Sequence, residues 1–129
     1  MIFSLAVYAA PYSQEGSSTA LRFAESALKQ GHQLYRVFFY GDGVHNSNHL
    51  HSPPQDETNL PLRWKTLANT HNIDLVVCIA ASLRRGVLNR EEADRYEKNN
   101  HNCEAPFNVS GLGQMIDASV NSDRVITFA

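Results

Sequence analysis

The chain has 129 residues, 43% of them hydrophobic and 19% charged, which fits a single globular domain covering residues 1–129. Its formal net charge of −2 at pH 7 gives no support for the basic surface of a nucleic-acid-binding protein, so we expect no direct nucleic-acid partner. The apolar N-terminus lacks the basic start of a secretory signal and no apolar run has the length of a membrane span, so we expect a cytoplasmic protein without membrane attachment.

The chain begins with an apolar run that is followed by helical periodicity. Residues 2–9 are almost continuously apolar, which is typical of a strand buried on both faces. Ser17 or Ser18 is predicted to cap a helix that ends near Gln30, where Gly31 stops it.

The same alternation continues with a second strand at residues 33–40. Residues 41–59 are polar and rich in turn residues, and loops of this length in compact domains are often functional. A helix is predicted over residues 60–70, because its apolar residues share one face and Pro61 lies in its first turn.

The third strand is predicted at residues 73–80. Asn89, with Glu92 three residues later, resembles a capping box at the start of a polar surface helix. Residues 107–109 predict a short strand and residues 124–128 a final one. Between them, Ser110 is expected to cap a helix whose buried face carries four residues, Leu112, Met115, Ile116 and Ser119.

Strands that alternate with helices predict a three-layer α/β/α domain of the flavodoxin-like class, with a mostly parallel sheet of about five strands. In such folds, ligands and reactive groups gather outside the carboxyl ends of the strands. Cys78 falls near the carboxyl end of the third predicted strand, and is therefore the first candidate for chemistry.

Two hypotheses for Cys78 follow from the residues alone. Free cysteine often acts only as a small buried hydrophobe. A helix N-terminus or a cation near the thiol would instead favour the nucleophilic thiolate; residues 80–83, which include Ser82, can form such a helical turn, and Arg84 and Arg85 supply cations. The spacing from Cys78 to Arg84 also matches cysteine phosphatases, but no glycine lies between them to let backbone amides converge on an oxyanion.

Other candidate residues have a weaker basis. Cys103 is either a resolving thiol for an oxidised Cys78 or a loop cysteine without a role. His45, His49 and His51 are expected to be solvated loop residues, because no further ligand completes a metal set beside them.

The segment "APYSQEGSST" at residues 10–19 leads into a predicted helix N-terminus. Such a terminus can hold an anion, for example a flavin phosphate, but the segment matches neither a dinucleotide fingerprint nor a P-loop. The preferred interpretation is a capped helix start, with a flavodoxin-like flavin binder as the alternative.

Three blocks in the same order, "HQLYRVFFYGDGVHNSN", "VVCIAASLRRGV" and "SGLGQMIDASVNSDRVITF", resemble the DsrE/TusD family of small sulfurtransferases. The resemblance covers essentially the whole chain and implies a DsrE-like fold. It also implies that Cys78 carries sulfur as a persulfide, without cofactor or metal, and that this thiol is exposed enough to meet two partner proteins in turn. Arg84, Arg85 and Ser82 are expected to support this thiol, and Gly41 and Gly43 to let backbone approach it.

The resemblance implies partners as well. In the TusD branch, the subunit joins TusB- and TusC-like chains in a heterohexamer, receives sulfur from a TusA-like donor and passes it to a TusE-like acceptor for tRNA wobble-uridine 2-thiolation. In the DsrE branch, DsrF- and DsrH-like partners serve sulfur oxidation. A non-catalytic binding subunit, with Cys78 packed in the core, is the remaining alternative.

Overall fold

The computed structural model describes all residues, 1–129, and contains one five-stranded sheet in which every strand pair is parallel, in the order β4-β3-β2-β1-β5. The strands are β1 Ile2–Val7, β2 Gln33–Phe39, β3 Asp74–Cys78, β4 Phe107–Ser110 and β5 Arg124–Phe128. The helices are α1 Gly16–Lys29, the 3₁₀ helix η1 Gly41–Ser47, α2 Leu60–His71, α3 Ile79–Arg84, α4 Arg90–Arg95 and α5 Gly113–Asn121.

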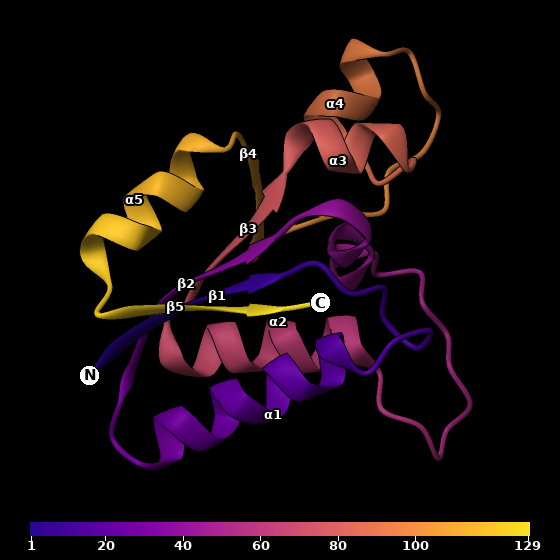
Figure 1. Ribbon diagram of the computed structural model, residues 1–129. Helices are drawn as coiled ribbons and strands as arrows, with labels where there is room; N and C mark the ends of the chain where they lie inside the picture. The colour runs from indigo at the N-terminus through magenta and orange to yellow at the C-terminus, as the bar shows by residue number, and fades with distance from the viewer.

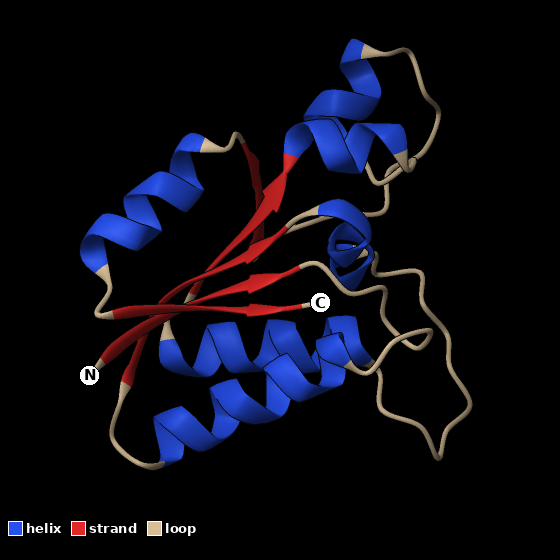
Figure 2. Ribbon diagram, viewed as in Figure 1, coloured by secondary structure: helices blue, strands red, loops and turns tan.

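The helices form two layers and a separate lobe around the sheet (Figures 1 and 2). α1 and α2 lie together on one face, and α5 covers the other face. η1, α3 and α4 lie beyond the carboxyl ends of the strands. The predicted α/β/α class with a parallel sheet of five strands is therefore confirmed. None of these helices combines the length and the apolar character needed to cross a membrane.

The first helix does not begin as predicted. Glu15 is its N-cap and makes no side-chain cap, so the prediction that Ser17 or Ser18 would cap α1 is wrong. The Ser17 hydroxyl instead donates to the backbone oxygen of Ala9 at 2.8 Å, and it accepts a hydrogen bond from Asn46 at 3.0 Å. Tertiary contacts take this hydroxyl away from the local cap because burial leaves it no water to bond.

The Asn46 side chain joins three elements in the interior beside the carboxyl ends of β1 and β2. Its amide donates to Ser17, and its oxygen accepts from the Trp64 indole at 3.2 Å. All three residues are fully buried. Gly43, in the same 3₁₀ helix, lies so close to β1 that an added Cβ would be 2.0 Å from the Val7 oxygen. η1 is thus packed tightly onto the sheet, rather than being the open loop that residues 41–59 predicted.

The last helix also differs from its prediction. Ser110 ends β4 and Leu112 is the N-cap residue of α5, so Ser110 does not cap the helix. Leu112 and Ile116, predicted to face the core, are 54% and 66% exposed, while Ala118 is the fully buried residue of this helix. Apolar periodicity correctly indicated a helix but assigned its outer face to the interior.

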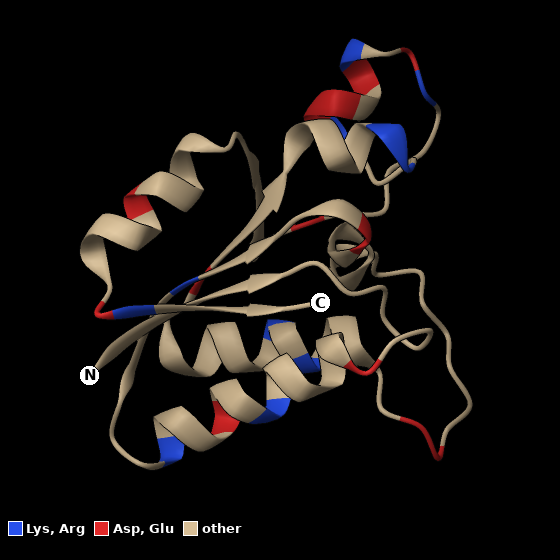
Figure 3. Cartoon of the chain, in the orientation of Figure 1, with Lys and Arg blue, Asp and Glu red and all other residues tan.

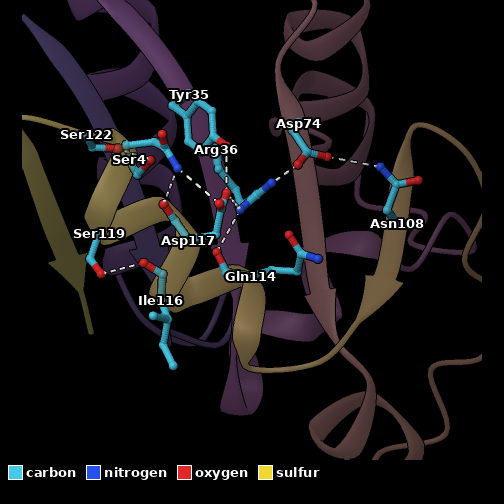
Figure 4. Close-up of polar contacts among 11 residues, drawn as sticks. Ser4, Tyr35, Arg36, Asp74, Asn108, Gln114, Ile116, Asp117, Ser119 and Ser122 are labelled. Atoms are coloured by element: carbon cyan, nitrogen blue, oxygen red, sulfur yellow. Dashed lines mark hydrogen bonds and ion pairs between the residues drawn. The ribbon is translucent and has the colours of Figure 1, made fainter.

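A charged cluster anchors α5 to the sheet (Figure 4). Arg36 of β2 donates to Asp74 of β3 at 2.7 Å and to Asp117 of α5 at 2.8 Å. It also donates to the backbone oxygen of Gln114, and the Tyr35 hydroxyl donates to Asp117 at 2.6 Å. Burial opposes the charge on Arg36, but the hydrogen bonds that it donates to Asp74 and Asp117 raise its pKa. The cluster therefore fixes which face of α5 meets the sheet.

Candidate functional site

Cys78 is the last residue of β3 and the N-cap residue of α3. Its backbone is extended, with φ −63° and ψ 120°, and it pairs in register with Ser110 of the edge strand β4. The chain changes from strand to helix at this residue, so the thiol is attached to two rigid elements. The prediction that Cys78 lies at a strand's carboxyl end is confirmed.

Cys78 is nevertheless buried, with only 2% of its surface exposed. The expectation that the thiol would be open to partner proteins is wrong for the isolated chain. The physical reason is that η1 and α3 pack together over the ends of the strands, where a sequence-based view expected a free loop. Access to the thiol therefore requires these elements to move or a partner to displace them.

The side chain of Cys78 belongs to the α5 side of the sheet. Alternate residues of a strand share a face, and Asp74, four residues earlier in β3, contacts Arg36 beneath α5. Tyr40 continues β2 in extended conformation, and its backbone N–H donates to Val7 at 3.0 Å. Extending the β2–β3 register by one position places Tyr40 beside Cys78.

A second tyrosine, Tyr8, lies beside Tyr40. Tyr8 continues β1, since its N–H donates to Phe128 at 2.8 Å, and its ring centroid lies 5.4 Å from that of Tyr40. Tyr8 is 42% exposed. Sequence reasoning missed both tyrosines; the signal that would have found them is their position at the ends of the first two predicted strands.

The two arginines after Cys78 have different surroundings. Arg85 donates from Nε to Asp42 of η1 at 2.8 Å and from Nη1 to the Ala81 oxygen at 3.0 Å. This hydrogen bond from Arg85 lowers the pKa of Asp42. Arg84 is exposed and makes no ion pair. Arg85 therefore holds α3 against η1, and Asp42 is a site residue that the sequence did not reveal.

Ser82 and the two glycines have structural surroundings. Ser82 is fully buried, and its hydroxyl donates to the Ile79 oxygen inside α3 at 2.9 Å. Gly43 allows η1 to approach β1, which is the close backbone approach expected of it, although its neighbour is Val7 rather than the thiol. Gly41 has a φ of +57°, a conformation that glycine adopts without strain.

Cys103 is also a buried free thiol, 1% exposed, within the same apolar core as Cys78. Burial raises its pKa, although a hydrogen bond with Ser47 acts in the opposite direction. A raised pKa disfavours the thiolate that a resolving cysteine needs. The structure therefore adds no support to a resolving role for Cys103.

The three histidines do not form one cluster. His45 and His51 line a cavity of about 600 Å³ beyond β1 and β2, whereas His49 lines another. No group of three or more His, Cys, Asp or Glu side chains is arranged to hold a metal ion. Burial, followed by the nearby His45, lowers the pKa of His51, and its Nδ1 atom is buried without a hydrogen-bond partner.

The N-terminus of α1 is closed by the protein's own backbone. A Cβ at Gly16 would lie 2.6 Å from both the Ala129 oxygen and the Ala9 side chain. The first turn of α1 is therefore packed against the end of β5, where a phosphate would need open space. This removes the support that residues 10–19 offered for a flavin binder.

The fold and this site define a class of protein: a parallel α/β domain with one cysteine placed where a central strand becomes a helix. The chain belongs to the DsrE/DsrF-like family, whose model matches residues 1–128. The resemblance identified from the sequence is thereby confirmed.

Known proteins of similar sequence match this chain along its full length. The chain is 47% identical to the "Sulfurtransferase TusD homolog" of Pseudomonas aeruginosa, over 99% of this chain and 97% of that protein. It is 44% identical to the "Putative sulfurtransferase DsrE" of Allochromatium vinosum, over 99% and 98%. The names of these relatives confirm the expected class, sulfurtransferase, at the level of the family.

A solved structure supports the fold alone. The YchN protein from E. coli superposes with a TM-score of 0.77 over 98% of this chain and 97% of that chain, at 20% identity. At 20% identity, this comparison supports the same fold but says nothing about the residues of the site.

Proposed function

We propose that the chain, acting as one domain over residues 1–129, is a sulfur-relay protein that accepts sulfur on Cys78 as a persulfide and passes it on. The observation that carries this proposal is the position of Cys78, which is the last residue of β3 and the N-cap residue of α3. A helix N-terminus stabilises a thiolate, which is the nucleophile of sulfur transfer. The full-length similarity to proteins named sulfurtransferase supports the same chemistry.

The transfer needs no other reagent than the two thiols. The Cys78 thiolate attacks the outer sulfur of a donor persulfide, R–S–SH, and a new S–S bond forms at Cys78. The donor S–S bond breaks, its electron pair stays on the donor sulfur, and that sulfur takes up a proton. An acceptor thiolate then repeats the step on the Cys78 persulfide, and no net oxidation occurs in either step.

We infer that the sulfur serves tRNA wobble-uridine 2-thiolation, with the chain as a TusD-like subunit beside TusB- and TusC-like chains. A TusA-like donor and a TusE-like acceptor complete the relay. Similarity to proteins named TusD in Pseudomonas and, at 41% identity, Salmonella supports this branch. The 44% identity to DsrE supports the second candidate, a DsrE-like subunit that handles sulfur in sulfur oxidation with DsrF- and DsrH-like partners.

The surface of α5 supports assembly with other subunits. Leu112, Ile116 and Val120 follow one another at a spacing of four residues and are 54%, 66% and 77% exposed. The one charged residue of this helix, Asp117, is engaged by Arg36 and Tyr35. Uncharged apolar surface of this kind is typical of protein interfaces. Two free thiols support placement in the reducing cytoplasm.

Sulfur loading of matched cysteine variants tests the proposal. Wild-type, Cys78→Ser and Cys103→Ser proteins are incubated with a donor persulfide carrying labelled sulfur, in the presence of the partner subunits. We expect label on the wild-type and Cys103→Ser chains, its release to an acceptor thiol, and none on Cys78→Ser. Label that still binds to and leaves the Cys78→Ser chain overturns the proposal.

The burial of Cys78 favours the competing hypothesis of a non-catalytic binding subunit, and the same experiment separates the two. A binding subunit would join the partner assembly without acquiring label on Cys78. A carrier must acquire it once the donor and partner subunits are present.

A further inference from the structure

We propose, on the basis of the proposed sulfur relay, that the groove between α3 and α4 docks the protein that exchanges sulfur with Cys78, through an acidic segment that carries an apolar side chain. The groove has a volume of about 490 Å³. Six residues line it: Leu83, Arg84, Gly86, Leu88, Tyr96 and Lys98.

The charge of the groove is one-sided. Arg84 and Lys98 are its charged lining residues, and neither has a carboxylate partner. Of the other cations on α3 and α4 or directly after α3, Arg85 is paired with Asp42 and Arg95 with Glu92, whereas Arg90 does not line the groove. Figure 3 shows the basic end of α3 facing away from the sheet, while the acidic residues of α4, and Glu97 just after it, are outside the lining set. Two unpaired cations select an acidic partner.

The walls of the groove supply apolar contact between these cations. Leu83 and Leu88 are half-buried, and Tyr96 is 52% exposed at the end of α4. Tyrosine and arginine are enriched among the residues that dominate binding energy in interfaces, where they surround an apolar anchor of the partner. The combination fits a peptide segment with one apolar side chain flanked by carboxylates.

The groove lies within reach of the thiol. α3 has six residues and begins directly after Cys78, so Arg84 lies about 9 Å further along the helix axis at 1.5 Å per residue. An extended peptide covers that length with about three residues. A partner that binds in the groove can therefore present a cysteine near the start of α3. Its contact with α3 can also displace the elements that cover Cys78.

Binding of a short synthetic peptide tests the docking without any sulfur chemistry. The probe contains glutamates around a leucine, with serine in place of its cysteine, and a second probe has lysines in place of the glutamates. Fluorescence anisotropy measures the affinity of each for the wild-type chain, for Arg84→Glu/Lys98→Glu, and for Arg22→Glu/Arg124→Glu, which makes the same charge change at exposed positions far from the lobe.

We expect the groove variant to bind the acidic peptide about tenfold more weakly and the lysine peptide more tightly, and the control variant to bind like wild type. Equal affinity of the wild type and the groove variant, or an equal loss in the control variant, overturns the docking proposal.

A second measurement separates this inference from the proposed function. Wild-type chain, with the partner subunits present, is treated with the persulfide of an uncharged cysteine ester and with the cysteine persulfide form of the acidic peptide. Failure of both donors to load Cys78 counts against the sulfur relay, whereas the anisotropy data still decide the docking. If both load it, the ratio of peptide to ester rates is expected to fall in the groove variant, and an unchanged ratio contradicts docking.

Discussion

Arg85 lies 2.8 Å from Asp42, and this ion pair joins the helix that begins directly after Cys78 to the 3₁₀ helix that follows β2. The pair lies at the surface, with 29% and 58% of the two side chains exposed. It therefore connects a buried thiol to a contact that solvent reaches. Control of access to Cys78 is the consequence that can be measured first.

Replacing Arg85 by glutamine is expected to increase the rate at which iodoacetamide alkylates Cys78 in the native chain by about threefold, because surface ion pairs are weak and their loss shifts local opening modestly. The measurement is mass spectrometry of the Cys103→Ser background. Arg63→Gln, which removes the ion pair with Glu25 between α2 and α1, is the matched control. Equal alkylation of all three chains would show that this contact does not govern access.

Replacing Arg36 by methionine is expected to lower the free energy of unfolding by about 2 kcal/mol, because charged hydrogen bonds are lost from a nearly buried side chain. Asp117 contributes through its pKa, which hydrogen bonds from Tyr35 and then Arg36 lower below 3.8. A carboxylate with a depressed folded-state pKa stabilises the fold above its unfolded value, and that stability is lost as the pH falls through the folded value.

Urea unfolding at pH 7 and at successive steps below pH 4 checks both statements. Asp117→Asn should be less stable than wild type at pH 7, and the difference should shrink in acid. A difference between the two chains that stays constant from pH 7 to pH 2 contradicts this role for Asp117.

Lowering the pH from 7.5 to 5.5 is expected to destabilise the chain partly through His51. Burial lowers the folded-state pKa of His51 below its ordinary 6.5, so the unfolded chain binds the proton first. The stability that the neutral His51 ring contributes to the fold is present above pH 6.5 and is lost as the pH falls through the lower folded-state pKa. Between pH 7.5 and 5.5, the urea midpoint of His51→Gln should decrease less than that of the wild type. His71→Gln changes an exposed histidine as a control, and its midpoint should decrease as much as that of the wild type.

Introducing a charge on the outer face of α5 is expected to weaken assembly without weakening the fold. Ile116 is 66% exposed, so Ile116→Glu should change the free energy of unfolding by no more than about 0.5 kcal/mol. Burial of that carboxylate in an interface should reduce association with partner subunits at least tenfold. Size-exclusion chromatography of co-expressed subunits measures this, and Leu62→Glu, an exposed apolar position on α2, is the control.

The sequence predicted the order of elements well because apolar runs and helical periodicity are local signals. The final strand matches its predicted residues 124–128, and Asn89 caps α4 through the Glu92 N–H as expected. The third strand was predicted too long, because Ile79 begins α3 directly after Cys78. A run of apolar residues does not record the point at which a strand becomes a buried helix.

The sequence by itself determined the parallel α/β class, the family, and the position of Cys78 at the end of a strand. Only the tertiary structure decided that Cys78 is 2% exposed and that Arg85 is engaged by Asp42 while Arg84 is left unpaired. It also turned Leu112 and Ile116 outward, because Arg36 fixes the opposite face of α5 on the sheet. Burial and pairing depend on segments that lie far apart in the chain, so no local pattern carries them.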